Sequence, residues 1–191
     1  MKILKEKAGL ILVEAIMAVS MMGIGVVILG SIVSSGVDNL SLSRDYITAQ
    51  NLATEGLEII KGVRDTNWLL KPNDRKCWLR VSPDSACTNI VYEKSYIPLK
   101  LSDERNYLSE QTKPFDLSTG IEYPKYRLYT KDGFYTHEAS GADATEFYRS
   151  INVLNVDNSN YDFATFEIKV QWRSGSKIRE VKRVFTMYNS L

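Results

Sequence analysis

A single carboxylate, that of Glu14, stands in a long apolar stretch of the chain. From Leu10 to Val37 the sequence reads LILVEAIMAVSMMGIGVVILGSIVSSGV, in which Glu14 is the only ionisable side chain. A charge at the middle of a bilayer costs about 2.5–3.5 kcal/mol on insertion scales. Because a plain anchor would be more stable with leucine there, the acid indicates a further role. The chemistry that a carboxylate offers in such surroundings is pairing with a positive charge.

The uncharged residues 15–37 are enough to cross a membrane. They number 23, and a helix needs about 20 to span the hydrocarbon core. Lys2, Lys5 and Lys7 precede them, so the positive-inside rule predicts a cytoplasmic N-terminus and an exported C-terminal part. A cleaved secretory signal is the alternative, but its apolar core normally has about 7–15 residues. The longer run favours an anchor.

The residues around Gly9 resemble the class III leader of type IV prepilins and type II secretion pseudopilins. Lys7-Ala8-Gly9 is followed by Leu10-Ile11-Leu12-Val13-Glu14, so a short basic leader, a glycine, apolar residues, an acid and a long apolar helix occur together. The resemblance implies that a membrane-embedded prepilin peptidase cuts the Gly9–Leu10 bond and methylates the new amine of Leu10. The family usually has Phe or Met at that place, from which Leu10 departs.

The same resemblance implies a role for the acid. In the family, this glutamate is thought to neutralise the terminal ammonium of a neighbouring subunit during assembly. Carried over, the assembly ion pair joins Glu14 of one subunit to the amine of Leu10 of the next. Unlike charges attract strongly at low dielectric, although each is also desolvated. The alternative is that Glu14 lies near the membrane surface and extends its carboxylate to water.

Length, charge and histidine content restrict the remaining classes of function. The chain has 191 residues, enough for an anchor and one globular domain, and a formal net charge of +1. Any catalytic triad would have to use the one histidine, His137, which follows a tight turn. We find no P-loop, nucleophile elbow or zincin motif. We therefore expect a protein that is not an enzyme, with no cofactor and no metal.

The two cysteines, Cys77 and Cys87, lie in the part of the chain that is predicted to be exported. Disulfides persist outside the cytoplasm. The nine intervening residues form a loop short enough to close across a hairpin, so we predict a Cys77–Cys87 disulfide. A metal site with two cysteines would need further ligands, which a chain with one histidine does not readily supply.

The membrane helix is predicted to continue as an amphipathic helix. After a cleaved leader (1–9) and a membrane or assembly segment (10–37), residues 38–64 carry apolar side chains at three- and four-residue steps, typical of a helix that packs on a sheet. The predicted helix therefore runs from about residue 10 to about residue 64. The apolar stripe consists of Leu42, Tyr46, Ala49, Ala53, Leu57, Ile60 and Val63.

Residues 65–191 are predicted to form the exported head. The expected fold class is α+β, with a long helix packed on a C-terminal antiparallel sheet. Residues 69–122 look irregular, with one short strand expected at 90–92, and correspond to the variable loop of pilins. Residues 123–191 read as about four strands, because the Asp132-Gly133 turn and the alternation over 163–173 are strong signals. The ending FEIKVQW…SGSKIREVKRVFTMYN resembles minor pilins of the PilV group.

Two other polar features are open to more than one interpretation. The loop 157–162, DNSNYD, has oxygen ligands at close spacing but lacks the closing glycine and glutamate of an EF-hand, so we expect a polar turn, with calcium as the alternative. The last hairpin is basic. Its cations could bind the phosphates of DNA. Alternating charges on the outer face of a strand are usually just solvated, however, so DNA is kept only as an alternative partner. The basic residues are Lys169, Arg173, Lys177, Arg179, Lys182 and Arg183.

The sequence thus predicts a structural minor pilin or pseudopilin of a type IV pilus or a type II secretion-like filament. Its expected partners are other pilins, the prepilin peptidase, an inner-membrane assembly platform and, before assembly, membrane lipid. Its expected location is the bacterial inner membrane, as a single-pass protein with a cytoplasmic N-terminus, and then an extracellular or periplasmic filament. The alternative is a signal-anchored extracytoplasmic binding domain, for adhesion or DNA capture, that does not polymerise.

Overall fold

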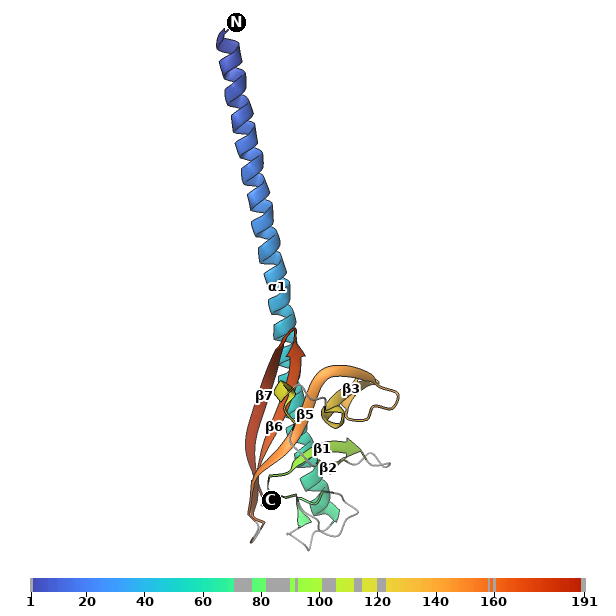
Figure 1. Ribbon diagram of the computed structural model, residues 1–191. Coiled ribbons are helices and arrows are strands. Elements are labelled where there is room, and N and C mark those ends of the chain that lie inside the picture. The colour runs from blue at the N-terminus through green and yellow to red at the C-terminus, as the bar shows by residue number, and fades with distance from the viewer. Residues whose placement is uncertain are drawn as a thin grey trace. The chain divides into compact units, whose positions relative to one another are not determined.

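The computed structural model describes residues 2–70, 77–81, 90–91, 93–100, 106–111, 115–119, 123–157, 159 and 161–189, with only the backbone described for 2–11 and 100. The chain divides into two compact units, Met1–Asp45 and Tyr46–Leu191. Figure 1 shows the elements of both units along the chain.

Helix α1 (Lys2–Leu70) supplies the described part of the first unit and continues into the second. Between Leu12 and Leu40 its large apolar side chains are 54–73% exposed. The helix is long and apolar enough to cross a membrane, as predicted from the sequence. The predicted end near residue 64 was wrong, because the helix continues to Leu70. Its last turns carry Asn67 and Trp68, whose side chains bind other parts of the head.

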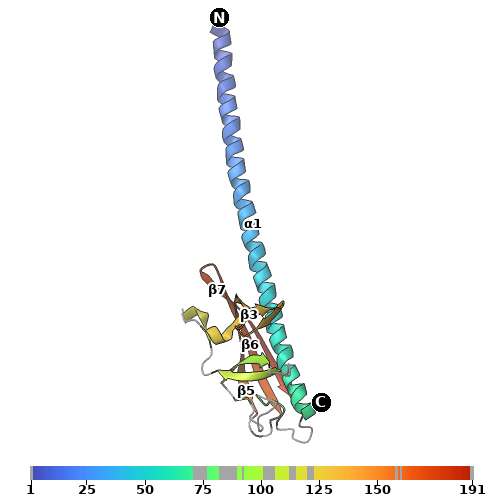
Figure 2. The same ribbon diagram turned by 90° about the vertical axis from the view of Figure 1, so that its right-hand side faces the viewer.

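The described residues of the second unit form an antiparallel sheet of seven strands, part of which can be followed in Figures 1 and 2. The strands are β1 (Ser95–Lys100), β2 (Asn106–Gln111), β3 (Arg127–Lys131), β4 (Phe134–Thr136), β5 (Asp143–Val156), β6 (Phe163–Ser174) and β7 (Lys177–Tyr188). Strand β5 is central. One of its edges pairs with β6, which in turn pairs with β7. Its other edge pairs first with β3 and then with β1, and β4 and β2 extend these two ribbons.

The predicted α+β class, a long helix and a C-terminal antiparallel sheet, is confirmed, but the predicted number of about four strands was too low. Strands β1 and β2 lie within the stretch 69–122 that looked irregular. Position 98 in β1 is a proline, which donates no ladder hydrogen bond. A proline argues against a strand, and for this reason β1 was not predicted from the sequence. The strand expected at 90–92 was also misplaced: residues 90 and 91 are not in a strand, and residue 92 is outside the described residues.

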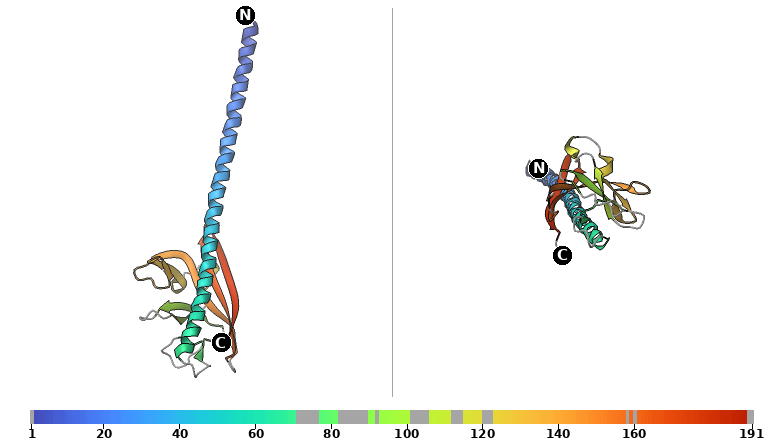
Figure 3. Two further views of the ribbon diagram at one scale, coloured as in Figure 1. Left: turned by 180° about the vertical axis from the view of Figure 1, so that it is seen from behind. Right: turned by 90° about the horizontal axis from the view of Figure 1, so that it is seen from below.

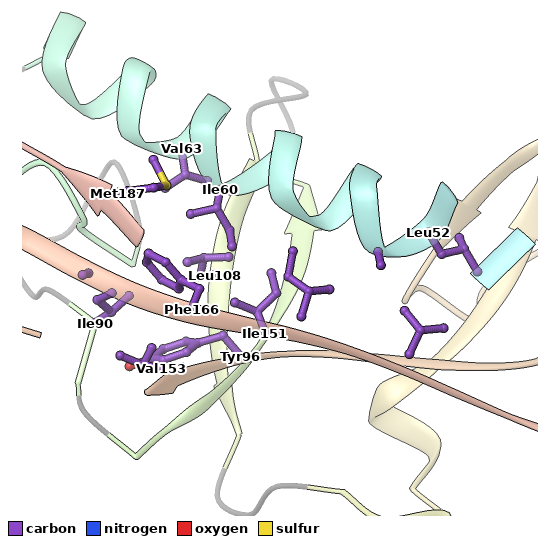
Figure 4. Close-up of a cluster of buried hydrophobic side chains, with 14 of the residues drawn as sticks. Leu52, Ile60, Val63, Ile90, Tyr96, Leu108, Ile151, Val153, Phe166 and Met187 are labelled. Carbon is purple, nitrogen blue, oxygen red and sulfur yellow. The ribbon is translucent and has the colours of Figure 1, made fainter. Parts of the chain in front are cut away.

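The C-terminal part of α1 packs on one face of the sheet (Figures 3 and 4). The predicted stripe is confirmed at four buried positions, and the half-buried Leu57 packs on the same core. Tyr46 is 51% exposed, and the centroid of its ring lies 6.4 Å from that of Trp172 on β6. Leu52 and Gly56, which the prediction left out, are buried. Gly56 marks a close approach, because a Cβ there would lie 3.1 Å from Cγ2 of Ile168 on β6. The confirmed positions are Ala49, Ala53, Ile60 and Val63.

The opposite face of the sheet is covered by the segments around two short 3-10 helices, η2 (Leu117–Thr119) and η3 (Pro124–Tyr126). A small second core forms there from Ile97, Phe115, Leu117, Tyr126 and Tyr148. Polar contacts fix this cover: the Leu117 N–H donates to the Gln171 side chain at 3.0 Å. The head therefore has helix, sheet and covering segment as its three layers, and part of the predicted variable loop is built into the third.

Candidate functional site

The predicted cleavage and assembly residues all lie in α1. Gly9 and Leu10 belong to the stretch for which only the backbone is described, so cleavage and methylation stay predictions. The side chain of Glu14 is exposed, as are the apolar side chains that surround it in sequence. Glu14 is therefore accessible to a charge supplied from outside this chain.

The predicted disulfide is only half covered by the described residues. Cys77 is fully buried at the start of the short segment 77–81, whereas Cys87 lies outside the described residues, so the pairing stays a prediction. The segment itself is well held. The Asn67 amide donates to the carbonyls of Trp78 (3.1 Å) and Arg80 (3.2 Å), and the Trp78 indole donates to the carbonyl of Tyr161 at 2.6 Å.

The basic residues of the last hairpin are divided between the two faces of the sheet. Residues directly opposite in an antiparallel ladder project to the same face. Arg183 and Arg179 lie opposite Ile168 and Trp172, which belong to the core beneath α1, and Lys177 lies opposite Ser174 on that same face. The Arg183 guanidinium accordingly donates to the Gln50 side chain on α1 at 2.7 Å.

The other three basic residues lie on the opposite face. Lys169 and Lys182 are paired in the ladder, and Arg173 lies opposite Ile178, which packs in the second core. The Lys169 ammonium donates to the carbonyl of Phe115 at 2.9 Å, and Lys182 forms a 3.0 Å ion pair with Glu180. The structure therefore does not bring the six residues of the predicted patch together on one surface, which weakens the case for DNA.

The loop at 157–162 binds its own backbone. One carboxylate oxygen of Asp157 accepts from the N–H of Ser159 at 3.0 Å and the other from that of Asp162 at 3.4 Å. The Asp157 carbonyl accepts from the Tyr161 N–H at 3.0 Å. Residues 158 and 160 are outside the described residues. The hydrogen bonds that are described are those of the polar turn that we expected.

A cleft that the sequence did not indicate lies in the head, between the two ribbons on the same edge of β5. Pairing with β3 ends at Tyr148 and pairing with β1 begins at Ile151. Arg149 lies in this interval, and its side chain lines a cavity of about 520 Å³. The walls come from α1, the β1–β2 ribbon and the β3–β4 hairpin. The change of partner along one strand edge therefore creates the cleft.

An ion pair between a buried arginine and a partly exposed glutamate lines the cleft. The Arg149 side chain is only 2% exposed, and its Nη1 lies 3.1 Å from the Glu55 carboxylate and donates to the Leu52 carbonyl at 3.2 Å. The Nε of Arg149 is buried and has no hydrogen-bond partner among the residues that the structure describes. Burial lowers the pKa of Arg149, and the charge of Glu55 opposes that shift. The pair thus places one buried cation beside an open space.

His137 is buried directly after β4, and the charge of Arg149 acts on its imidazole. Burial, and next the positive charge of Arg149, lower the pKa of His137 to about 3, while the backbone carbonyls of Arg127 and Lys125 act in the opposite direction. The imidazole is therefore neutral at physiological pH.

Comparison with known proteins gives no relative from which a function could be transferred. No protein-family model matches the chain, and no curated protein or solved structure matches it. The account of function therefore depends on the residues and on the fold described above.

Proposed function

We propose that this chain is a minor pilin or pseudopilin, a structural subunit that is cut between Gly9 and Leu10 and assembled into a filament through α1. One observation carries the proposal. A single helix supplies both an exposed apolar segment, from Leu12 to Leu40, and a buried stripe in the core of the head. An anchor segment that continues into the core helix of its head is the form that a filament subunit needs.

The exposed segment requires a covering. Apolar area that stays in contact with water costs about 25 cal/mol per Å², and a bilayer or the equivalent helices of neighbouring subunits would remove that cost. Lipid before assembly and other subunits afterwards are the two coverings that we propose. The membrane in question is the bacterial inner membrane, with the N-terminus in the cytoplasm and the head outside.

The position of Glu14 supports assembly over simple anchoring. A helix that only anchors the head gains nothing from an exposed carboxylate among apolar side chains. A subunit whose neighbour presents a free amine at Leu10 gains an ion pair in a low-dielectric environment. The alternative, an anchored binding domain that does not polymerise, leaves the acid without a role other than reaching water.

The proposal is tested by Glu14→Ala, expressed in cells that hold the peptidase and the assembly platform. We expect normal leader removal and a strong fall in the fraction of the chain that is recovered with sheared filaments. Asp38→Ala is the matched control, since Asp38 is also exposed on α1 but lies beyond the apolar run. Equal recovery of both variants would refute the assembly role of Glu14.

A further inference from the structure

The cleft beside Arg149 has the lining of a ligand site rather than of a packing defect. Its volume of about 520 Å³ falls in the range of about 300–1,000 Å³ that small-molecule sites occupy. Its walls come from separate elements, α1, β1, β2, the β3–β4 hairpin and β5. Convergence of several elements on one concave space is the usual arrangement of a binding site.

The charges around the cleft restrict the ligand. Among the described residues, the lining includes three acidic residues, Glu55, Asp132 and Glu138, and two basic ones, Lys131 and Arg149. An anion would meet the carboxylates, and a cation would meet Arg149 and Lys131. A wholly apolar ligand would strip water from all of these groups without replacing its hydrogen bonds. A neutral molecule with many donors and acceptors avoids these conflicts.

Hydroxyl groups fit this mixture, because each is both a donor and an acceptor. They can donate to the carboxylates of Asp132 and Glu138 and accept from the Lys131 ammonium. The Asn106 amide, which also lines the cleft, can do either.

An aromatic surface completes the site. Phe134, on the short strand β4, lines the cleft and is 77% exposed. The adjacent Tyr135 is half-buried and lines the same space. An exposed ring beside polar groups suits a ligand with one apolar face and a polar edge, as a pyranose ring has.

We propose that this cleft binds a neutral saccharide of one or two rings, with Phe134 stacking on the sugar and Asp132, Glu138 and Lys131 binding its hydroxyls. This site does not depend on polymerisation, so it can fail while the proposed filament role holds, and the reverse. It gives the exported head a recognition function that the helix does not supply.

The test uses the full chain in a phosphocholine detergent, because detergents with sugar head groups would compete. Saturation-transfer NMR is measured with glucose, galactose, mannose, N-acetylglucosamine, lactose and maltose, followed by titration of any binder. We expect at least one of these to bind, with a Kd of about 1 mM or lower. Sodium phosphate and spermidine are tested alongside as charged probes.

Two variants tie binding to the cleft. Phe134→Ala and Glu138→Gln change exposed side chains, so the head should stay folded, and we expect Phe134→Ala to weaken binding by about tenfold or more. Tyr188→Ala is the control, an exposed aromatic on β7 that does not line the cleft. Absence of saccharide binding, binding that both cleft variants leave unchanged, or preference for phosphate or spermidine would each overturn the proposal.

Discussion

The Arg149 guanidinium lies 3.1 Å from the Glu55 carboxylate, and this ion pair joins the central strand of the sheet to helix α1. A second bond, to the Leu52 carbonyl at 3.2 Å, fixes the guanidinium against the helix backbone. Arg149 is almost fully buried, whereas the Glu55 side chain is 42% exposed. The buried cation therefore depends on one partly solvated counter-charge.

Removing that counter-charge should destabilise the head. Loss of one partner from a fully buried pair costs about 3–5 kcal/mol, and solvent around Glu55 reduces this, so we expect about 1–2 kcal/mol for Glu55→Gln. Urea unfolding of the full chain, followed by tryptophan fluorescence, measures it. Glu58→Gln is the control, because Glu58 pairs with Lys61 on the surface and should change stability by less than about 0.5 kcal/mol. Equal losses of stability in the two variants would show that the Arg149–Glu55 pair stabilises the head no more than a surface ion pair does.

Glycines 56 and 62 should respond in opposite directions to a larger side chain. A Cβ at Gly56 would lie 3.1 Å from Ile168, whereas one at Gly62 would have no atom of the described residues within 4 Å. Gly56→Val should therefore destabilise the head by about 1–3 kcal/mol through overpacking. Gly62→Ala should stabilise it by about 0.5–1 kcal/mol through helix propensity. The urea concentration at half-unfolding of each variant measures these effects. A Gly56→Val variant as stable as the parent would contradict the close approach of α1 to Ile168.

His137 should make the head acid-sensitive. Its folded pKa, about 3, lies below the unfolded value of 6.5, so the unfolded chain binds the extra proton between these values. Stability is therefore fully present above pH 6.5 and is lost as the pH falls. We expect a loss of about 2 kcal/mol between about pH 6.5 and pH 4.5. His137→Gln should remove most of this slope, and an unchanged slope would assign the acid sensitivity to other groups.

Asn67 should be the polar residue on α1 that the head tolerates losing least. It is 1% exposed and its amide binds two carbonyls, those of Trp78 and Arg80. Asn67→Ala leaves these buried acceptors short of a donor, so we expect a loss of about 1–3 kcal/mol in urea unfolding. Asn51→Ala is the control, because Asn51 is exposed on the same helix. A loss no greater than that of the control would contradict the anchoring role.

The sequence predicted those parts of the fold that local patterns dictate. The apolar run specifies the helix, the Asp132-Gly133 turn specifies a hairpin, in which both residues have positive φ, and the alternation in β6 specifies its buried face. These signals lie within a few neighbouring residues, so one sequence suffices to find them.

What the sequence did not reveal depends on contacts between distant segments. Arg149 counts as a charged strand residue until Glu55, far away in sequence, is seen to pair with it. Gly56 has no side chain to enter a hydrophobic pattern, although the helix lies close to Ile168 of the sheet at that position. The basic residues of the last hairpin are close together in sequence and were predicted to form one patch. Because side chains alternate along a strand, they lie on two faces of the sheet. The cleft results from pairings along β5 that no local pattern encodes.

The central claim, that α1 is freed at Leu10 to assemble, is tested most directly by the N-terminus of the mature chain. The protein is recovered from the surface of cells that contain the prepilin peptidase, and its N-terminal peptide is identified by mass spectrometry. Our account predicts a chain that begins with N-methylated Leu10. A surface-exposed chain that still begins at Met1 would contradict it and favour a permanently anchored binding domain.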